Sequence, residues 1–503
     1  MAHYSKSEQR LVVFITALVT GIGFIDTTAL NVALPFIQRD LNASAADTYW
    51  VLEIYLLGLA ALLMAGGALG DALGRRRPLY WGVALFAATS LGCALSTSAS
   101  ALIFFRALQG ISAALMVPAS LALLNASFAP EDRGAAIGRW SALVSLTIPI
   151  GPLFGGLAVD LFSWQLIFWV NVPLCLLVLW LMRSLRRPPF EPPETVPLDV
   201  VGSGLVTIAL GLMTYALMEA GRQGSFTALH SQLLIAGILT FGLFIFSQFK
   251  RKSPMIPPAL FKDRRFVIVN LHTLLLFASF QSATFFLSFL LVQSYGYGAT
   301  QAGAAALPIS ILVTILSRYA GQWTAKHGPR AILSLSSLML GISFIWLSQT
   351  DGRYIETILA PMILLGLGVA AFAAPVTTVA MVSAGKGRDG LASGVNNAVA
   401  RIGPLLAIAA IGYAMAFEFE NHLRTHALFG TLPEMAQSFM IAHLNELGGM
   451  IFPDDWPVES RDMAQIIIKE AYADTVKFAM KICGAMMGLC ILLSLCYHKD
   501  DAL

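Results

Sequence analysis

The chain has 503 residues, of which 57% are hydrophobic and only 12% are charged, and its mean hydropathy is +0.73. Soluble domains carry roughly 25% charged residues, so this composition excludes an ordinary soluble protein and predicts a multi-pass membrane protein. The formal net charge of +3 is too small to indicate a nucleic-acid partner.

Apolar runs long enough to cross a bilayer follow one another along the chain and predict an all-α polytopic fold with fourteen transmembrane helices. The first run is too long for a cleaved signal peptide and carries a carboxylate, so we interpret it as a retained span. The predicted spans are 11–35, 50–70, 79–98, 101–125, 135–160, 165–183, 200–220, 231–249, 266–294, 302–323, 331–349, 355–380, 390–415 and 474–497.

Lys and Arg residues gather in alternate loops, for example at 75–77, 250–252 and 386–388. All of these loops fall on the side of the N-terminus, which the positive-inside rule assigns to the cytoplasm. An even number of spans then places both termini in the cytoplasm. The predicted location is the cell (inner) membrane.

Two connections are longer than the others. The first, 183–197, is rich in proline and cannot be helical throughout. The second, from Phe417 to about Asp474, is predicted to be external and rich in Asp and Glu. Its last part, DMAQIIIKEAYADTVKF, has helical periodicity and is expected to lead directly into the last span. A small external cap and a substrate gate both remain open as interpretations of this segment.

The two halves of the chain repeat each other at an offset near 254 residues. GALGDALGRRR at 67–77 aligns with GQWTAKHGPRA at 321–331, and Gly151-Pro152 aligns roughly with Gly403-Pro404. Secondary transporters are often built from such repeats. The predicted organisation is a six-helix bundle at 1–187, a linker and inserted helix pair at 188–252, and a second six-helix bundle at 253–503 with an external loop at about 417–473.

The charged side chains of Asp26, Glu53 and Arg106 lie within predicted spans of the first half and are candidate functional groups. Asp26 stands roughly 12 Å below the membrane surface, counted back from Pro35 at 1.5 Å per residue. A carboxylate at that depth is costly unless it is paired, protonated or facing water. Arg106 needs an anion there, and both Asp26 and Glu53 are candidates. One acid is left over, and this surplus negative charge could hold a proton or a cationic substrate.

Structural explanations stay open beside the functional one. Arg106 could tether helices through Gln109 and backbone carbonyls, and Glu53 could reach the membrane interface without any further role. Asp26 lies deepest and is the hardest of the three to explain as merely structural. The five cysteines show no paired or metal-ligand spacing, so neither a disulfide frame nor a metal site is predicted.

Five motifs follow one another in the first half of the chain. They are Asp26-Thr27-Thr28 with Asn31-Val32-Ala33-Leu34-Pro35; Gly67-x-Leu69-Gly70-Asp71-x-x-Gly74-Arg75-Arg76; Arg106-x-x-Gln109-Gly110; Gly151-Pro152-x-x-Gly155-Gly156; and Trp164-x-x-Ile167-Phe168-x-x-Asn171-x-Pro173. In this order they resemble the major facilitator superfamily, in its fourteen-span drug:proton antiporter branch, and the resemblance covers essentially the whole chain.

The resemblance implies two six-helix bundles and a role for each motif. The loop with Gly67, Asp71, Gly74, Arg75 and Arg76 is expected to act as a cytoplasmic latch, in a single copy because Ala325 replaces the acid in the repeat. The kinked helix with Gly151, Pro152, Gly155 and Gly156 is associated with exchange rather than uptake. Mere tight packing is the alternative for this helix.

Thr147 departs from the family pattern, which usually has a glycine there, so looser packing is expected at this point. In the second half, Arg401 matches an arginine that the branch commonly carries, whereas Arg318 does not match and could either reach the interface or pair with Asp389. Candidate cavity residues of this half are His272, Gln281, Asn396, Asn397 and Arg401.

The resulting hypothesis is a proton-coupled efflux transporter of amphiphilic, cationic drugs or biocides that works by alternating access. Asp26, Glu53 and Arg106, with Asn31 and Gln109, would form its coupling site. It would need no cofactor beyond the proton gradient, and its partners would be the substrate, protons, the lipid bilayer and, as a further candidate, a periplasmic adaptor. An exporter of an endogenous metabolite, lipid or siderophore is the alternative. A membrane sensor or enzyme is a distant one, since the chain has no recognisable catalytic or nucleotide-binding motif.

Overall fold

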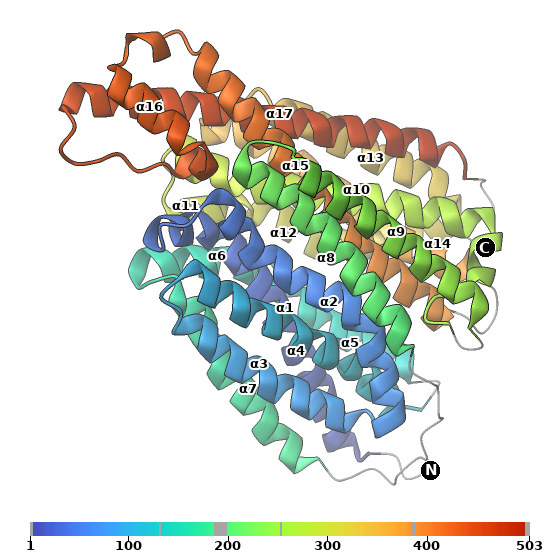
Figure 1. Ribbon diagram of the computed structural model, residues 1–503. Helices are drawn as coiled ribbons and strands as arrows, with labels where there is room; N and C mark the ends of the chain where they lie inside the picture. Colours follow the sequence, from blue (N-terminus) through green and yellow to red (C-terminus); the bar gives the residue numbers. More distant parts are fainter. Residues whose placement is uncertain (1–3, 130–131, 186–198, 252–253, 384–388, 498–503) are drawn as a thin grey trace. The chain divides into compact units, whose positions relative to one another are not determined.

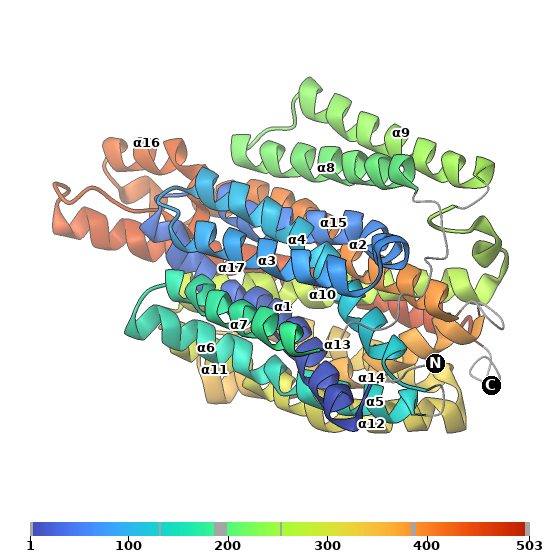
Figure 2. The same ribbon diagram turned by 90° about the horizontal axis from the view of Figure 1, so that it is seen from below.

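The computed structural model describes residues 4–129, 132–185, 199–251, 254–383 and 389–497 (Figures 1 and 2). Within these ranges the regular elements are all helices. Most of the proline-rich connection predicted at 183–197 lies outside the described residues. The helices of the first half and the inserted pair are α1 (Lys6–Asp40), α2 (Ala45–Leu73), α3 (Arg76–Ala94), α4 (Ala99–Ala126), α5 (Arg133–Ser145), α6 (Thr147–Leu161), α7 (Gln165–Ser184), α8 (Val200–Gln223) and α9 (Ala228–Lys250).

The second half continues the helical pattern with short irregular turns between long helices. Two of these turns, η2 and η3, are π-helical, and η2 directly extends α10. The elements are η1 (Pro258–Lys262), α10 (Arg264–Phe289), η2 (Leu290–Ser294), α11 (Ala299–Ala305), α12 (Leu307–His327), α13 (Pro329–Leu347), η3 (Tyr354–Ile358), α14 (Leu359–Ser383), α15 (Asp389–Thr425), η4 (Phe429–Thr431), α16 (Glu434–Ala442), η5 (Leu444–Gly449) and α17 (Val458–Ser494).

Thirteen segments of the described chain are helical, long and apolar enough to cross a membrane. The one predicted span missing from this set is 79–98. It does form a helix, α3, but this helix has only 19 residues and begins with Arg76 and Arg77, which lower its hydropathy. The helical membrane fold predicted from the sequence is therefore confirmed.

Two predicted spans are interrupted where prolines remove backbone donors. The span predicted at 135–160 is divided into α5 and α6 at Leu146. Pro149 has no N–H to donate to the carbonyl of Ser145, and its ring crowds that carbonyl, so the helix breaks there. The span predicted at 302–323 is likewise divided into α11 and α12, just before Pro308.

The long helices α15 and α17 extend well beyond the predicted membrane spans. α17 runs without a break from Val458 to Ser494, which confirms that the acidic segment leads directly into the last span. Pairs one turn apart, such as Arg424 with Glu420 at 2.7 Å, stabilise the polar extensions. Hydropathy marks where the apolar run ends, whereas these helices continue with polar residues.

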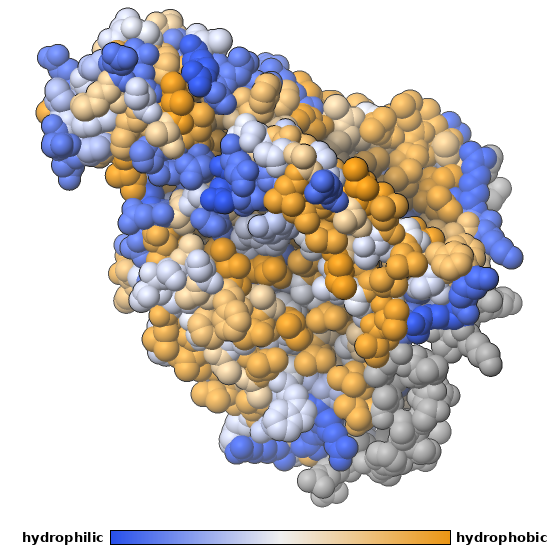
Figure 3. Space-filling model, in the orientation of Figure 1, coloured by the Kyte–Doolittle hydropathy of each residue, from blue (hydrophilic) through white to orange (hydrophobic). Residues whose placement is uncertain are grey.

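Between α15 and α17 lies a small folded segment, residues 426–457, which we call the cap. It contains η4, α16 and η5. The ring of Phe439 stacks on His443 at 4.0 Å and contacts Trp456 at 5.2 Å, and Trp456 also contacts Phe452 at 5.3 Å. These aromatic contacts give the cap a core of its own. Figure 3 shows the cap mainly in the colours of hydrophilic residues, whereas the flanks of the long helices are largely hydrophobic.

The chain divides into two compact units. The first contains residues 1–31, 50–210 and 239–257, and the second contains 32–49, 211–238 and 258–503. The helices α1 and α2 therefore begin or end in the second unit and have their longer parts in the first. The inserted helices α8 and α9 lie side by side as a hairpin in both views (Figures 1 and 2).

Each unit uses the same helix pairings. In the first unit α3 packs on α4 and α7, and in the second α13 packs on α14 and α17. The contact of α6 with α1 in the first unit corresponds to the contact of α15 with α10 in the second. A Cβ on Gly155 of α6 would lie 2.5 Å from the carbonyl of Ala29, and one on Gly403 of α15 would lie 2.6 Å from the carbonyl of Leu274. This equivalence supports the repeat read from the sequence, while the exact domain limits stay a prediction.

The repeated glycines occupy the same unusual backbone conformation. Gly74 has a φ of +81° and Gly328 a φ of +82°. Gly328 ends α12 and immediately precedes α13, where the chain must reverse. This φ is readily adopted only by glycine, which explains why the two copies keep a glycine at this position.

We expect Gly328→Ala to destabilise the protein, because an L-residue at this φ and at ψ 166° is strained by about 1–3 kcal/mol. Gly74→Ala should act in the same direction. The matched control is Gly204→Ala within α8, where a Cβ meets nothing within 4 Å and alanine favours the helix. Thermal unfolding in detergent micelles measures the effect. A Gly328→Ala midpoint at or above that of Gly204→Ala would contradict this account.

Candidate functional site

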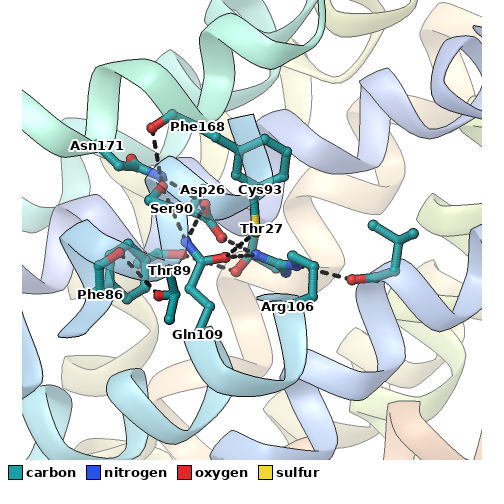
Figure 4. A network of polar contacts seen from close by, with 12 residues as sticks. Asp26, Thr27, Phe86, Thr89, Ser90, Cys93, Arg106, Gln109, Phe168 and Asn171 are labelled. Atoms are coloured by element: carbon teal, nitrogen blue, oxygen red, sulfur yellow. Dashed lines mark hydrogen bonds and ion pairs between the residues drawn. The ribbon is translucent and has the colours of Figure 1, made fainter. Parts of the chain in front are cut away.

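A buried polar cluster lies inside the first unit, where four helices each contribute side chains (Figure 4). Its members are at most 1% exposed. They are Asp26 of α1, Ser90 of α3, Arg106 and Gln109 of α4, and Asn171 of α7.

Asp26 is hydrogen-bonded on both carboxylate oxygens. Its Oδ2 accepts from Nη1 of Arg106 at 2.6 Å, and its Oδ1 accepts from Asn171 at 2.8 Å and from Gln109 at 3.3 Å. A buried carboxylate with an arginine and two amide donors has its charge compensated and its lone pairs occupied. Asp26 is therefore the fixed centre of the cluster.

Arg106 is held by α2 as well as by Asp26. Its Nε donates to the carbonyl of Val51 at 2.9 Å, and its Nη1 also donates to Oε1 of Gln109 at 2.7 Å. The guanidinium lies over the ring of Tyr55, 4.2 Å from the centroid. Gln109 thus binds both members of the ion pair, which agrees with the tethering role considered for Arg106 without excluding a functional one.

Glu53 is the acid that Arg106 does not bind. Its side chain is fully buried, and neither carboxyl oxygen has a hydrogen-bond partner in the described part of the chain. Val51 and Tyr55, four residues apart, share the face of α2 that holds Arg106, and Glu53 lies roughly 200° around the helix from Val51. The sequence predicted one surplus acid beside one arginine, and this geometry assigns the surplus to Glu53.

Two members of the cluster were not among the predicted site residues. The hydroxyl of Ser90 donates to the carbonyl of Phe168 at 3.0 Å and accepts a hydrogen bond from the side-chain amide of Asn171 at 3.1 Å. Asn171 was noted only as part of a motif. A polar residue inside each of two apolar runs was the available signal. Asn31, which was predicted, is not part of the cluster's hydrogen bonds, and its Oδ1 has no partner in the described residues.

The helix with the antiporter motif packs directly on α1. A Cβ on Gly151 would lie 1.8 Å from Oγ1 of Thr28, and one on Gly155 only 2.5 Å from the carbonyl of Ala29. Pro152 and Gly156 are buried in the same helix. The glycines of α6 therefore permit a close approach to the segment of α1 that also carries Asp26.

Thr147 does not loosen this contact, contrary to the expectation from its departure from the family pattern. A Cβ on Gly21 of α1 would lie only 2.8 Å from Cγ2 of Thr147. The missing glycine of α6 is thus replaced by a glycine on the facing helix, and the packing stays close.

The predicted latch loop is only partly described. Gly67 has ordinary space around it, since a Cβ there would meet Pro118 at 3.7 Å, and the side chain of Asp71 lies outside the described residues. Arg76 donates to the carbonyls of Leu185, at 3.0 Å, and Met182. A cation at these last carbonyls stabilises the end of α7. Arg75, beside it, is half-buried and directly precedes α3.

In the second unit, the predicted residues Asn396 and His272 belong to two separate polar contacts rather than to one. Asn396 of α15 donates to Thr273 at 2.8 Å and to Asn270 at 3.3 Å, both on α10. His272, the neighbour of Thr273, is buried against Ser337 of α13 with a 3.2 Å contact, and its ring stacks on Tyr497. Successive helical residues point in different directions, so His272 and Asn396 are not brought together by these contacts.

The remaining predicted residues of this half are less buried. Gln281 and Arg401 are half-buried, and Asn397 is exposed, with its amide donating to the carbonyl of Ser393 at 2.9 Å. The side chains of Arg318 and Asp389, considered as a pair, lie outside the described residues. A cavity lined by all five predicted residues stays a prediction.

Comparison with known proteins gives the class that this architecture belongs to. The family model described as Major Facilitator Superfamily matches residues 16–408, and the chain belongs to this family of membrane transporters. It is 30% identical to the multidrug resistance protein Stp of Mycobacterium tuberculosis, covering 95% of this chain and 90% of that protein. It is 32% identical to the tetracenomycin C resistance and export protein of Streptomyces glaucescens, covering 100% and 94% of the two chains.

Solved structures agree on the fold. A bacterial homologue of the human lysosomal transporter Spinster, in an inward-facing and unoccupied conformation, matches with a TM-score of 0.68 at 15% identity over 97% of both chains. The peptide transporter POT in complex with sulfate matches with a TM-score of 0.60 at 15% identity, over 95% of this chain and 94% of that one. The Stp and tetracenomycin C relatives are named as resistance and export proteins, and the chain is a transporter of this efflux-like type rather than an enzyme.

We expect Asp26→Asn to lower the free energy of unfolding by about 3–5 kcal/mol, because Arg106 would keep a buried charge without a counter-charge. Adding Arg106→Gln should recover part of this loss, since the two charges are then removed together. Unfolding titrations with sodium dodecyl sulfate in mixed micelles measure both variants. Equal stability of Asp26→Asn and the wild type would contradict the fixed ion pair.

The glycines of α6 give a second prediction. Gly151→Ala should reduce thermal stability, and Thr28→Ala added to it should restore most of the loss, because the clash is with a side-chain oxygen. Gly155→Ala should be more harmful and should not respond to Thr28→Ala, since its Cβ meets the backbone of Ala29. Rescue of Gly155→Ala by Thr28→Ala would show that the two contacts are not independent.

Proposed function

We propose that this protein is a proton-coupled exporter that moves amphiphilic, cationic compounds out of the cell by alternating access. The observation that carries the proposal is the fully buried carboxyl group of Glu53, which lacks both a counter-charge and a hydrogen-bond partner in the described chain. The resistance and export functions named for the relatives agree with it.

The argument starts from the free energy of a buried charge. An ionised carboxylate without a partner in a low-dielectric interior is strongly disfavoured, and such a group takes up a proton instead. Glu53 therefore holds a proton in this conformation. When the site opens to water or receives a cation, the ionised form is stabilised and the proton leaves. A proton and a cationic substrate then compete for one carboxylate, which is the minimal requirement for antiport.

Asp26 has a different part in this proposal. Three donors already satisfy its carboxylate, and Glu53 lies on the opposite face of α2 from the residues that hold Arg106. Proton exchange at Glu53 consequently does not require the ion pair to break. Asp26 and Arg106 hold α1, α2 and α4 together while Glu53 exchanges its ion.

The proposed orientation follows from the distribution of Lys and Arg, and it places both termini on the cytoplasmic side of the inner membrane. A periplasmic adaptor as a partner stays a prediction. The second candidate function is export of one endogenous metabolite. It is favoured by the name of the Streptomyces glaucescens relative, which refers to resistance and export of a single compound.

We expect Glu53→Gln to abolish substrate-induced proton movement, because the amide cannot ionise, while leaving the fold intact, because it resembles the protonated acid. Purified protein in proteoliposomes with an internal pH dye provides the measurement, with and without Na⁺. Glu418→Gln, at the polar end of α15, is the matched control and should behave like the wild type. Proton-coupled transport that survives in Glu53→Gln would refute the role of this carboxylate.

The same proteoliposomes can test the substrate class. A cationic dye and an anionic dye of similar size and hydrophobicity are compared, and only the cation should move with proton exchange in the wild type. Transport of neither dye, together with proton-coupled transport of tetracenomycin C, the compound in the name of the Streptomyces glaucescens relative, would favour the metabolite exporter. Equal transport of both dyes would contradict the charge preference.

A further inference from the structure

The second unit contains a contact between the cap and a segment that belongs in sequence to the first two helices. This segment, residues 32–49, comprises the end of α1, the turn after it and the start of α2, and we call it the hairpin tip. It is assigned to the second unit, whereas the rest of α1 and α2 is assigned to the first.

The side chain of Gln38 joins the hairpin tip to the cap. It is only 2% exposed, and its Nε2 donates to the backbone carbonyl of Glu446 in η5 at 2.9 Å. Its Oε1 accepts from Nε2 of Gln293 in the π-helical turn η2, also at 2.9 Å. One amide therefore satisfies partners on two different elements, and the loss of either contact would leave a buried polar group unpaired.

The backbone of the cap is shaped closely around this amide. A Cβ on Gly449 would lie 2.5 Å from Nε2 of Gln38, and one on Gly448 would lie 2.8 Å from Oε1 of Gln293. Between them and Glu446, Leu447 has a φ of +50°, which is strained for a leucine. A strained turn followed by two glycines brings the Glu446 carbonyl to Gln38 and leaves room for both amides.

An aromatic contact at Tyr49, the last residue of the hairpin tip, also holds this segment. Tyr49 is 4% exposed, and its ring meets those of Phe285, Phe286 and Phe289 of α10 edge-on at 5.2, 5.7 and 5.6 Å. Edge-to-face pairs of this kind add to the stabilisation from burial. The hairpin tip is thus held at two points, by the amide of Gln38 and by the aromatic cluster around Tyr49.

The boundary between the units falls where α1 is weakened. Pro35 has no N–H for the carbonyl of Asn31, and the first unit ends at Asn31. A change of conformation in this part of the chain must either bend α1 at Pro35, with the tip left in place, or pull the tip away from the cap. The amide contact and the aromatic cluster decide which of these occurs.

We propose that the cap is a gating element of the transporter, and that Gln38 is the positioning residue through which it holds the hairpin tip until substrate is released. The inference rests on the proposed export function. It assigns to the cap the gating role left open by the sequence, and it locates the contact that must break. In this proposal the contact between Gln38 and Glu446 opens once in each cycle of alternating access, instead of α1 bending with the tip left in place.

The test is a reversible cross-link. The pair Gln38→Cys with Gly449→Cys, joined by a short bis-methanethiosulfonate, should abolish dye efflux, and reduction should restore it. The control pair His426→Cys with Glu470→Cys replaces a 3.0 Å contact between the cap and α17 that leaves the hairpin tip free, and efflux should continue when it is cross-linked. Unchanged efflux in the cross-linked Gln38 pair, with the cross-link verified by mass spectrometry, would overturn the proposal.

A second measurement does not depend on transport. Ala46→Cys introduces a thiol at a buried position of the hairpin tip. When Gln38→Leu is added, this thiol should react about tenfold faster with a membrane-impermeant maleimide than in Ala46→Cys alone, since two hydrogen bonds are lost. Gly449→Ala should act in the same direction. An unchanged labelling rate would overturn the gating contact even if Glu53→Gln abolishes proton coupling. Faster labelling in a protein whose Glu53→Gln variant still exchanges protons would retain the contact and reject the proposed coupling.

Discussion

The structure of the first unit depends on the ion pair between Asp26 and Arg106. Two opposite charges in a buried, low-dielectric interior are tolerated only when each is compensated by the other and by further hydrogen bonds. Here Gln109 of α4 and Asn171 of α7 supply those bonds, and Ser90 of α3 accepts a hydrogen bond from each of these two amides. α2 supplies a carbonyl and an aromatic ring. The pair is therefore connected to five helices, and a second carboxyl group placed outside it is free to take a different role.

Much of the fold could be predicted because the membrane imposes strong rules on sequence. Apolar runs mark the spans, and the repeat at 254 residues is visible again in the matched φ angles of Gly74 and Gly328. Helix ends were predicted less well. Polar extensions such as the end of α15 are stabilised by local ion pairs, and the break at Leu146 depends on Pro149, which a count of apolar residues does not weigh.

The sequence predicted most of the residues of the candidate site, but not how they are arranged around Arg106. Asp26, Glu53, Arg106 and Gln109 were found because charged and amide side chains are costly in apolar runs. Depth along each helix does not say which face a residue occupies, and so the pairing of Arg106 was left open. The spacing of Val51 and Tyr55 around Glu53 contains that information. The contact of Gln38 with the cap joins residues more than 400 positions apart, and no local pattern predicts it.

Gly21 and Thr147 show that close packing between α1 and α6 belongs to the interface rather than to either helix. The small residue stands on α1 in this chain, and the bulkier one on α6. A family signature written for α6 alone would score this sequence as degenerate at position 147. A signature that reads both sides of the interface would accept it, and relatives should exist in which the two sizes are exchanged.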